Sequence, residues 1–264
     1  MRLANKIAIV IGAGQGPGEG LGNGRATVLR FVQEGARVLA VDRNLASAQE
    51  TAGLAGDECI AFEADVTREA ALAAAIEHAK NRWGRIDIAH YNVGVSLVGG
   101  DAGPLEITEE AFDRISAINL RGCVMACKHV LPVMRAQRSG VILTISSVAA
   151  WEVYPTVAYK ATKAAMIAYT QQLAIQNAEF GVRANAILPG LMDTPMAVDT
   201  RARVTGKSRA EIAAMRDAKV PLRRKMGSAW DVANAALFLA SDEAGFITGA
   251  ALPVDGGALV KIGS

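Results

Sequence analysis

The stretch from Ile7 to Gly24 reads IAIVIGAGQGPGEGLGNG, and it decides the fold. It opens with five apolar, mostly β-branched residues, a run too short for a helix and typical of a strand buried on both faces. Seven glycines then occupy every second position from Gly12 to Gly24, and a helical stretch follows. A strand, a glycine-rich turn and a helix in this order predict a nucleotide-binding unit, in which backbone amides at the start of the helix approach a pyrophosphate.

The glycine-rich turn can be joined to the helix in two ways. If the turn ends at Gly18, the helix starts at Glu19 and contains three further glycines, each of which costs about 1 kcal/mol. If Gly22 and Gly24 open the helix, the loop carries extra residues and the helix is free of glycine beyond its first turn. We prefer the second alternative.

The alternation of short apolar runs and helical stretches continues through the chain. It predicts an α/β fold, a Rossmann-type doubly wound sheet of seven parallel strands with helices on both faces. No linker or repeat divides the sequence, so we expect one dinucleotide-binding and catalytic domain over residues 1–264. The expected strands are Ile7–Ile11, Arg37–Val41, Cys59–Ala64, Ile86–Tyr91, Val141–Ile145, Arg183–Leu188 and Ala250–Val254, and the expected helices are Gly24–Glu34, Leu45–Leu54, Arg68–Trp83, Thr108–Arg135, Val157–Phe180 and Ala229–Ala240.

Composition narrows the possible functions and locations. A net charge of +2 is too small to indicate a nucleic-acid partner. No run of 18 apolar residues predicts a membrane span, and the amino terminus does not resemble a signal peptide. Cys59, Cys123 and Cys127 do not have metal-ligand spacing, so we expect no metal site and interpret them as buried free thiols in a reducing, cytoplasmic compartment.

Two further features indicate binding of an adenosine ribose and acid/base chemistry. Asp42 ends the second strand, where a carboxylate can accept hydrogen bonds from an adenosine ribose and repel a 2′-phosphate, which predicts NAD; the alternative is a simple turn residue. Tyr159 and Lys163 are four residues apart and therefore lie on the same helix face. An ammonium beside a phenol favours the phenolate, so we expect Lys163 to lower the pKa of Tyr159 and make it a usable acid and base.

Together these residues resemble the short-chain dehydrogenase/reductase family, and the resemblance covers nearly the whole chain. It implies a catalytic tetrad of Asn119, Ser147, Tyr159 and Lys163. It also implies a bound NAD and a homotetramer with helices 108–135 and 157–180 as contact faces. The motifs that carry the resemblance are the glycine turn, Asp65-Val66, Asn92-Val93-Gly94, Asn119, Ser146-Ser147, Tyr159/Lys163, Asn185 to Gly190, Thr194, Ile247-Thr248-Gly249 and Val254 to Gly257. The cofactor-binding residues that it implies are Gly12, Gly22, Asn23, Gly24, Asp42, Asp65, Val66, Asn92, Gly94, Tyr159, Lys163, Pro189, Gly190, Met192 and Thr194.

The sequence departs from the family pattern in places. Ile11 replaces the usual threonine, and about six extra residues lengthen the glycine loop. The spacing to Tyr159 favours Ser146 as the catalytic serine, whereas the register of the preceding strand favours Ser147, which we choose. Asn119 is either part of a water-linked relay to Lys163 or a satisfied core amide.

The remaining candidates lie around the expected substrate site. We expect residues 195–225 to form a substrate lid. Residues 201–225 carry nine basic side chains against two acidic ones, which indicates either a solvated mobile segment or attraction of an anionic substrate. Trp151 and Tyr154 either line the substrate pocket or are ordinary surface aromatics, and His90 is expected to be a packing residue.

The combined prediction is an NAD-dependent oxidoreductase that interconverts a secondary alcohol and a ketone. The rival is a catalytically silent NAD-binding protein that senses redox state, but the presence of all four tetrad residues argues against it. A related sugar-nucleotide epimerase would need an additional carboxyl-terminal substrate region.

Overall fold

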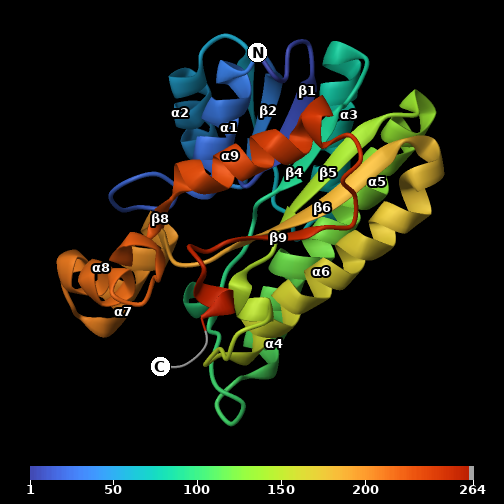
Figure 1. The fold of residues 1–264 in the computed structure, drawn as a ribbon. Coiled ribbons are helices and arrows are strands. Elements are labelled where there is room, and N and C mark those ends of the chain that lie inside the picture. Colours follow the sequence, from blue (N-terminus) through green and yellow to red (C-terminus); the bar gives the residue numbers. More distant parts are fainter. Residues whose placement is uncertain (262–264) are drawn as a thin grey trace.

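The computed structural model describes residues 1–261, and a seven-stranded parallel sheet runs through its centre (Figure 1). The strand order is β3-β2-β1-β4-β5-β6-β9, so the direction of winding changes between β1 and β4. The doubly wound fold predicted from the sequence is therefore confirmed. The strands are β1 Ile7–Ile11, β2 Arg37–Asp42, β3 Cys59–Glu63, β4 Ile88–Tyr91, β5 Gly140–Ile145, β6 Val182–Pro189 and β9 Ala251–Val254.

Helices cover both faces of the sheet (Figure 1). On one face, Phe31 of α1 and Leu237 of α9 pack on the outer surfaces of the strands. On the other face, α3, α5 and α6 contribute Leu72, Val130 and Met166 to a second core. The main helices are α1 Asn23–Gln33, α2 Leu45–Ala55, α3 Glu69–Trp83, α4 Glu109–Ser116, α5 Gly122–Gln137, α6 Val157–Asn177 and α9 Ala229–Ala240. Short 3₁₀ turns occupy Leu97–Gly99, Val148–Ala150, Ala178–Phe180, Leu222–Arg224, Asp242–Ala244 and Ala258–Val260.

Helix α1 begins where the second glycine alternative places it. Its first residue is Asn23, and Gly22 is the N-cap. A Cβ on Gly24 would lie 1.9 Å from the carbonyl oxygen of Gly12, so the helix packs directly on the turn and only glycine fits. The loop between Gly12 and Gly22 consequently carries the extra residues; we call residues 12–22 the glycine loop.

Two regions differ from the predicted elements. The helix expected over residues 108–135 is interrupted by a π-helical turn at Ala117–Arg121, between α4 and α5. The segment after β6 was expected to be irregular, but it contains a π-helical turn at Pro195–Asp199 and the helices α7 Thr200–Thr205 and α8 Arg209–Asp217. Strands β7 Met192–Asp193 and β8 Gly227–Ser228 pair at its base.

The lid segment, which we define as residues 195–225, has a small core of its own. Val198 and Ile212 are buried together with Val220 and Met226. Helix α8 starts with a capping box, in which Ser208 and Glu211 bond each other's backbone amides. The segment is therefore a folded unit that protrudes from the sheet (Figure 1).

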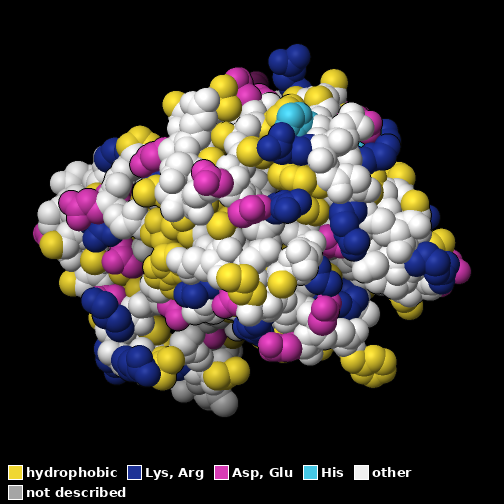
Figure 2. All heavy atoms as spheres, turned by 90° about the horizontal axis from the view of Figure 1, so that it is seen from above, with side chains coloured by type: hydrophobic (Ala, Val, Ile, Leu, Met, Phe, Trp, Pro, Cys, Tyr) yellow, Lys and Arg dark blue, Asp and Glu magenta, His cyan; other side chains and the backbone are white. Residues whose placement is uncertain are grey.

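The surface agrees with the small net charge. Figure 2 shows acidic and basic side chains interspersed over the face seen from above, without a large patch of either sign.

All three cysteines are buried and free. Within residues 1–261, no helix has the length and apolar character needed to cross a membrane.

Candidate active site

The predicted site residues gather at one edge of the sheet. Because the seven strands are parallel, the loops that follow their carboxyl ends emerge on the same side. Gly12 follows β1, Asn92 follows β4 and Ser147 follows β5. Asp42 is the last residue of β2, and Pro189 is the last residue of β6.

The start of α1 suits a pyrophosphate. The N-cap Gly22 forms no side-chain cap, so amides of the first turn remain available. The Oδ1 atom of Asn23 is buried without a partner among residues 1–261, which indicates a missing donor at this position. Gly12 has φ +87°, and a Cβ there would lie 2.9 Å from Val93 Cγ2, so both the backbone conformation and the packing at this turn require glycine. These groups fit a dinucleotide. Gly24, by contrast, acts by packing on Gly12.

The acidic residues of the predicted cofactor site are fixed by backbone amides. The carboxylate of Asp42 accepts hydrogen bonds from the amides of Gly14 (2.9 Å) and Asn44 (3.0 Å). Asp65 accepts the amide and the hydroxyl of Thr67 at 2.9 and 2.8 Å. Each oxygen of Asp42 accepts one of these bonds and retains a lone pair, and Thr67 occupies only Oδ1 of Asp65, so both carboxylates can still accept hydrogen bonds from a ligand.

The segment after β4 is tied to the glycine loop. The side-chain amide of Asn92 donates through Nδ2 to the Gly12 carbonyl at 3.0 Å. A Cβ on Gly94 would lie 3.0 Å from Lys163 Nζ, so glycine allows the lysine to approach this backbone closely.

Tyr159 and Lys163 face the same space on α6. Lys163 Nζ lies 5.6 Å from the centroid of the Tyr159 ring and donates to the Ile145 carbonyl at 2.6 Å. Burial lowers the pKa of Lys163 to about 8. Burial, followed by the neighbouring Tyr154, raises the pKa of Tyr159 to about 12, against the expectation that Lys163 would lower it. The expectation was wrong because desolvation of the phenolate raises the pKa of Tyr159 more than Arg201, Arg216 and the Ser147 hydroxyl lower it.

The two adjacent serines point in different directions. Ser146 is almost fully buried, and its hydroxyl donates to the Lys163 carbonyl at 2.7 Å. The Ser147 side chain accepts the Ala149 amide at 3.1 Å and lies near the Tyr159 phenol, where its hydroxyl acts to lower the pKa of Tyr159. The serine hydroxyl beside the phenol is therefore that of Ser147, as the strand register indicates.

Asn119 lies in the π-helical turn and is completely buried. Its Oδ1 accepts the Val95 amide at 2.8 Å, and its Nδ2 donates to the Val95 carbonyl (3.0 Å) and to Thr162 Oγ1 (3.1 Å). The side chain thus fastens the loop after β4 to α6. A relay through Asn119 stays a prediction.

Asp101 is a site residue that the sequence reasoning missed. Its buried carboxylate accepts the amides of Ala158 (2.9 Å) and Tyr159 (3.0 Å) and the hydroxyls of Thr156 (2.6 Å) and Ser96 (3.2 Å). It therefore caps the helix that carries Tyr159, a position favourable for a negative charge. No sequence signal marks it, because it is 57 residues from its helix partner Ala158.

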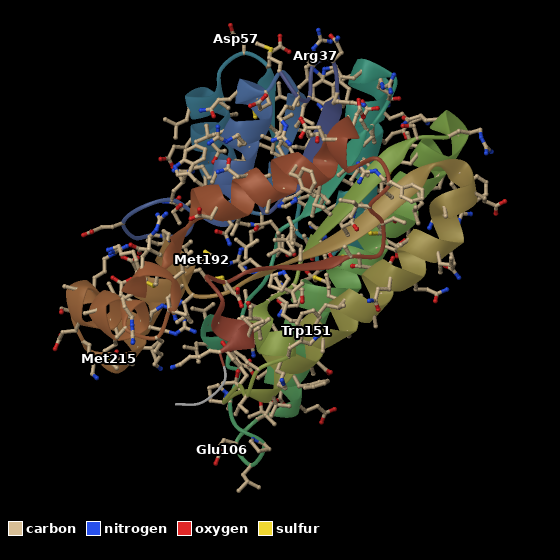
Figure 3. The ribbon with its side chains drawn as sticks, in the orientation of Figure 1. Arg37, Asp57, Glu106, Trp151, Met192 and Met215 are labelled. Atoms are coloured by element: carbon tan, nitrogen blue, oxygen red, sulfur yellow. The ribbon has the colours of Figure 1, made fainter. Side chains whose placement is uncertain are left out.

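The loop between Ser147 and Tyr159 and the lid segment border the phenol. The rings of Tyr154 and Tyr159 lie 5.5 Å apart, whereas Trp151 is 53% exposed. The charges of Arg201 and Arg216, from α7 and α8, reach Tyr159 and act to lower its pKa. Figure 3 shows Met192 between the sheet and the lid segment and Met215 on α8.

The residues after β6 connect the sheet to the lid segment. Gly190 packs on Asp255, where a Cβ would lie 2.7 Å from the aspartate Cβ. Met192 belongs to the short strand β7. The Thr194 hydroxyl accepts the Ala197 amide at 3.3 Å and thereby caps the following turn.

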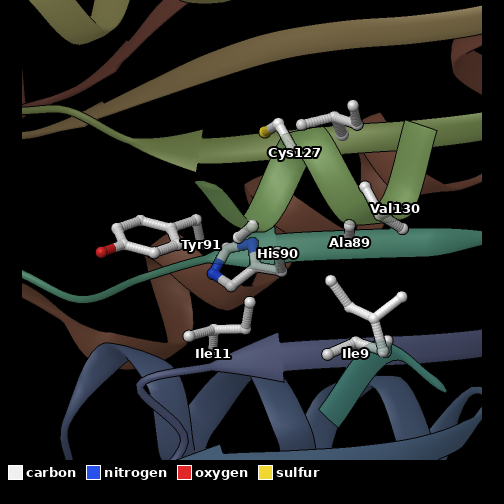
Figure 4. Close-up of a pocket in the computed structure, with 10 residues that line it drawn as sticks. Ile9, Ile11, Ala89, His90, Tyr91, Cys127 and Val130 are labelled. Atoms are coloured by element: carbon white, nitrogen blue, oxygen red, sulfur yellow. The ribbon is translucent and has the colours of Figure 1, made fainter. Parts of the chain in front are cut away.

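His90 lies in the core. Its ring packs against Phe31, and neither nitrogen has a hydrogen-bond partner among residues 1–261. Figure 4 shows it beside a small cavity, with apolar side chains around it and the Tyr91 hydroxyl pointing away. Burial lowers the pKa of His90 to about 3, in keeping with a packing residue. Among residues 1–261, no cluster of side chains could hold a metal ion.

Comparison with known proteins identifies the family of this chain. Residues 18–258 match the family model described as enoyl-(acyl carrier protein) reductase. The chain is 36% identical to the 2-(R)-hydroxypropyl-CoM dehydrogenase of Xanthobacter autotrophicus, covering 96% of this chain and 98% of that protein. It is 35% identical to the cyclohexanol dehydrogenase of a Rhodococcus strain, covering 97% of this chain and 96% of that protein. A short-chain dehydrogenase/reductase structure from Burkholderia xenovorans superimposes with a TM-score of 0.91 at 41% identity, over 99% of both chains. With the doubly wound sheet and the clustered site residues, these matches show that the chain belongs to the short-chain dehydrogenase/reductase family of oxidoreductases.

Proposed function

We propose that the protein is an NAD-dependent oxidoreductase that interconverts a secondary alcohol and a ketone. The observation that carries the proposal is the Tyr159 phenol at the carboxyl edge of the sheet, with the Ser147 hydroxyl near it and Lys163 Nζ 5.6 Å from the centroid of its ring. Two relatives have names that describe dehydrogenases of hydroxyl compounds, which supports this reaction class.

The chain's own residues supply proton transfer and orientation. The bound nicotinamide would accept or donate the hydride. Tyr159 exchanges the hydroxyl proton of the substrate, and Ser147 donates a hydrogen bond to the same oxygen, which stabilises the charge that develops there. Lys163 lies beside the phenol as a cation and favours the phenolate once a substrate and cofactor complete the site.

The cofactor would be held along the carboxyl edge. Asp42 would accept ribose hydroxyls, the start of α1 would hold the pyrophosphate and Thr194 would meet the carboxamide. We infer a preference for NAD over NADP, because a carboxylate repels a 2′-phosphate. Asp42→Ala should narrow the ratio of kcat/KM between the two cofactors by about tenfold or more. Arg43 is exposed beside it, and its guanidinium could offer a 2′-phosphate bidentate contacts, so Arg43→Ala should instead widen the preference for NAD. A native preference for NADP would contradict the inference.

We further infer that the substrate carries an anionic group. Arg201 donates to the Ala197 carbonyl at 2.8 Å, and Arg216 contacts the Met226 sulfur at 3.3 Å. Neither forms an ion pair within residues 1–261, whereas Asp193, Asp199 and Asp217 are paired with other basic residues. Burial, followed by the charge of Arg201, lowers the pKa of Arg216 to about 10. Two neighbouring cations beside the reacting tyrosine favour a carboxylate, sulfonate or phosphate on the substrate.

A matched substrate series tests the anionic group. Arg216→Gln should reduce kcat/KM for 3-hydroxybutyrate at least about tenfold more than for 2-butanol, because only the first alcohol carries a charge. Arg203→Gln is the control, since Arg203 is exposed on α7. Equal losses for the two alcohols would contradict an anion site.

The whole proposal is tested by screening secondary alcohols with NAD while the absorbance of the reduced cofactor is followed. Activity that disappears in Tyr159→Phe supports it. Cofactor binding without turnover of any alcohol or ketone would favour the redox-sensing alternative.

We also propose a cytoplasmic homotetramer. The buried free cysteines are compatible with a reducing compartment. The outer face of α4 and α5 contains a surface hollow of about 570 Å³, which a second copy would cover; its lining includes Leu120, Val124 and Met125. Light scattering after gel filtration measures the state, and Val124→Glu should shift it to smaller species.

A further inference from the structure

The tip of the glycine loop touches the lid segment, although the two are about 180 residues apart in sequence. The Glu19 amide donates to Asp199 Oδ1 at 3.1 Å. Gly18 has φ +147°, and a Cβ on it would lie 2.5 Å from Asp199 Cγ. The contact therefore requires a glycine at position 18.

One arginine gathers the acids around this contact. Arg209 of α8 donates through Nη2 to Asp193 at 2.5 Å. Its Nε lies 3.5 Å from the Asp199 carboxylate and 3.7 Å from that of Glu19. Asp193 directly precedes Thr194 in the sequence, so Arg209 connects the glycine loop to the neighbour of the residue that we assign to the nicotinamide carboxamide.

The loop is braced so that its tip reaches the lid segment. The Gln15 side chain accepts the Gly22 amide at 2.8 Å and donates to the Gly20 carbonyl at 3.0 Å. The Gln15 backbone amide donates to the Ser47 hydroxyl at 2.7 Å, and this hydroxyl donates to the Gln15 carbonyl at 3.1 Å. These hydrogen bonds thus hold the extra residues of the glycine loop in one conformation.

The position of the contact gives it a function. The glycine loop follows β1 and the lid segment follows β6, while β4 and β5 lie between these strands. A contact between the two segments therefore spans the carboxyl ends of β4 and β5, where a dinucleotide would lie. We propose that Gly18, Glu19, Asp199 and Arg209 form a clasp across the cofactor cleft and are positioning residues that retain the bound cofactor. This rests on the proposed function, because it assumes that a nicotinamide dinucleotide binds there.

The test measures cofactor release directly. The dissociation rates of NADH and NADPH are followed by stopped-flow fluorescence on the full chain. Gly18→Ala and Arg209→Gln should each increase the rate by about fivefold, since each breaks the clasp from a different side. Gly16→Ala is the matched control for the loop, because a Cβ there would meet no atom of residues 1–261 within 4 Å. Arg203→Gln is the control for the lid segment; it contacts Thr200 at 3.3 Å and lies outside the clasp.

The double variant distinguishes one clasp from two separate effects. If both substitutions break the same contact, Gly18→Ala/Arg209→Gln should release cofactor no faster than the faster single variant. Rates that multiply, or rates unchanged in both single variants, would overturn the clasp while leaving cofactor binding intact. Failure of the unmodified protein to bind NADH or NADPH would instead overturn the proposed function, and the clasp with it.

Discussion

The floor and the cover of the proposed cofactor site are held by different forces. The floor, formed by α6 and the ends of β4 and β5, is fixed by buried hydrogen bonds, such as those of Lys163 to Ile145 and of Asn119 to Val95. The cover, formed by the glycine loop and the lid segment, is fixed by charged groups around Arg209, which is only partly buried. Buried hydrogen bonds hold one geometry, whereas partly exposed charge pairs are weaker and sensitive to salt. The proposed reacting groups are thus held in one geometry, whereas the proposed cover depends on charge pairs that salt weakens.

The largest expected effect tests the floor. Tyr159→Phe removes the exchangeable proton but keeps the ring, so turnover should fall at least about a hundredfold while cofactor affinity is retained. Steady-state kinetics and cofactor titration measure the two quantities. Retained turnover would indicate a different acid.

The adjacent serines sharpen the same test. Ser147→Ala should reduce kcat severely because it removes the hydroxyl that faces the phenol. Ser146→Ala should be milder, since its hydroxyl donates to the backbone carbonyl of Lys163 and not to the phenol. The reverse order of the two kcat values would contradict the assigned roles.

The next effect concerns the core beneath the floor. Because burial lowers the pKa of His90 to about 3, the unfolded chain binds a proton more readily than the folded chain below the ordinary histidine value. Stability from this site is complete above about pH 6.5 and falls as the pH decreases, by about 2 kcal/mol at pH 5. His90→Leu should flatten the dependence of the unfolding free energy on pH between 6.5 and 4, measured by urea titration.

A surface histidine provides the control for that slope. His78 is exposed on α3 and packs on Phe62, so His78→Gln should leave the acid sensitivity unchanged. An unaltered slope in His90→Leu would show that other groups cause the loss of stability.

A smaller effect tests the cap on α6. Asp101→Asn replaces a carboxylate that faces four donors by an amide with one acceptor oxygen, which should reduce kcat about tenfold and destabilise the fold by about 1–3 kcal/mol. Cofactor affinity should hardly change, because Asp101 orients Tyr159 rather than the cofactor. Asp57→Asn, at an exposed position between α2 and β3, is the control; a loss of cofactor affinity equal to the loss of kcat would argue against positioning.

The smallest effect tests the cover. Raising the salt concentration from 0.05 to 0.5 M should accelerate cofactor release about twofold more in the unmodified protein than in Arg209→Gln, since screening weakens the same charge pairs that the substitution removes. Stopped-flow release measures this difference. An identical salt dependence of release in the two proteins would show that the charge pairs of Arg209 do not control cofactor release.

The regular part of the fold could be predicted because its signals are local. β1 and α9 have the predicted bounds, since apolar runs and glycines mark their ends. The start of α1 followed from the cost of glycine in a helix. Helix α8 was missed, although Ser208 and Glu211 have the spacing of a capping box.

The rest depends on contacts between distant residues. The cap by Asp101 and the clasp at Arg209 join segments whose distance in sequence carries no signal. The raised pKa of Tyr159 depends on burial, which a helix spacing does not reveal. The pairing of Tyr159 and Lys163 could be predicted, but the balance of desolvation and charge could not.

The π-helical turn at Ala117–Arg121 limits which segments of the chain can be exchanged for those of a relative. Such a turn closes over one residue more than an α-helical turn, and each residue rotates an α-helix by about 100°. Helices α4 and α5 are therefore out of phase, which lets α4 face α6 while α5 faces α3. Deleting one residue from the turn would restore a single phase and force either Asn119 away from Val95 or α5 away from α3. Chimeras with relatives should therefore exchange residues 109–137 as one block.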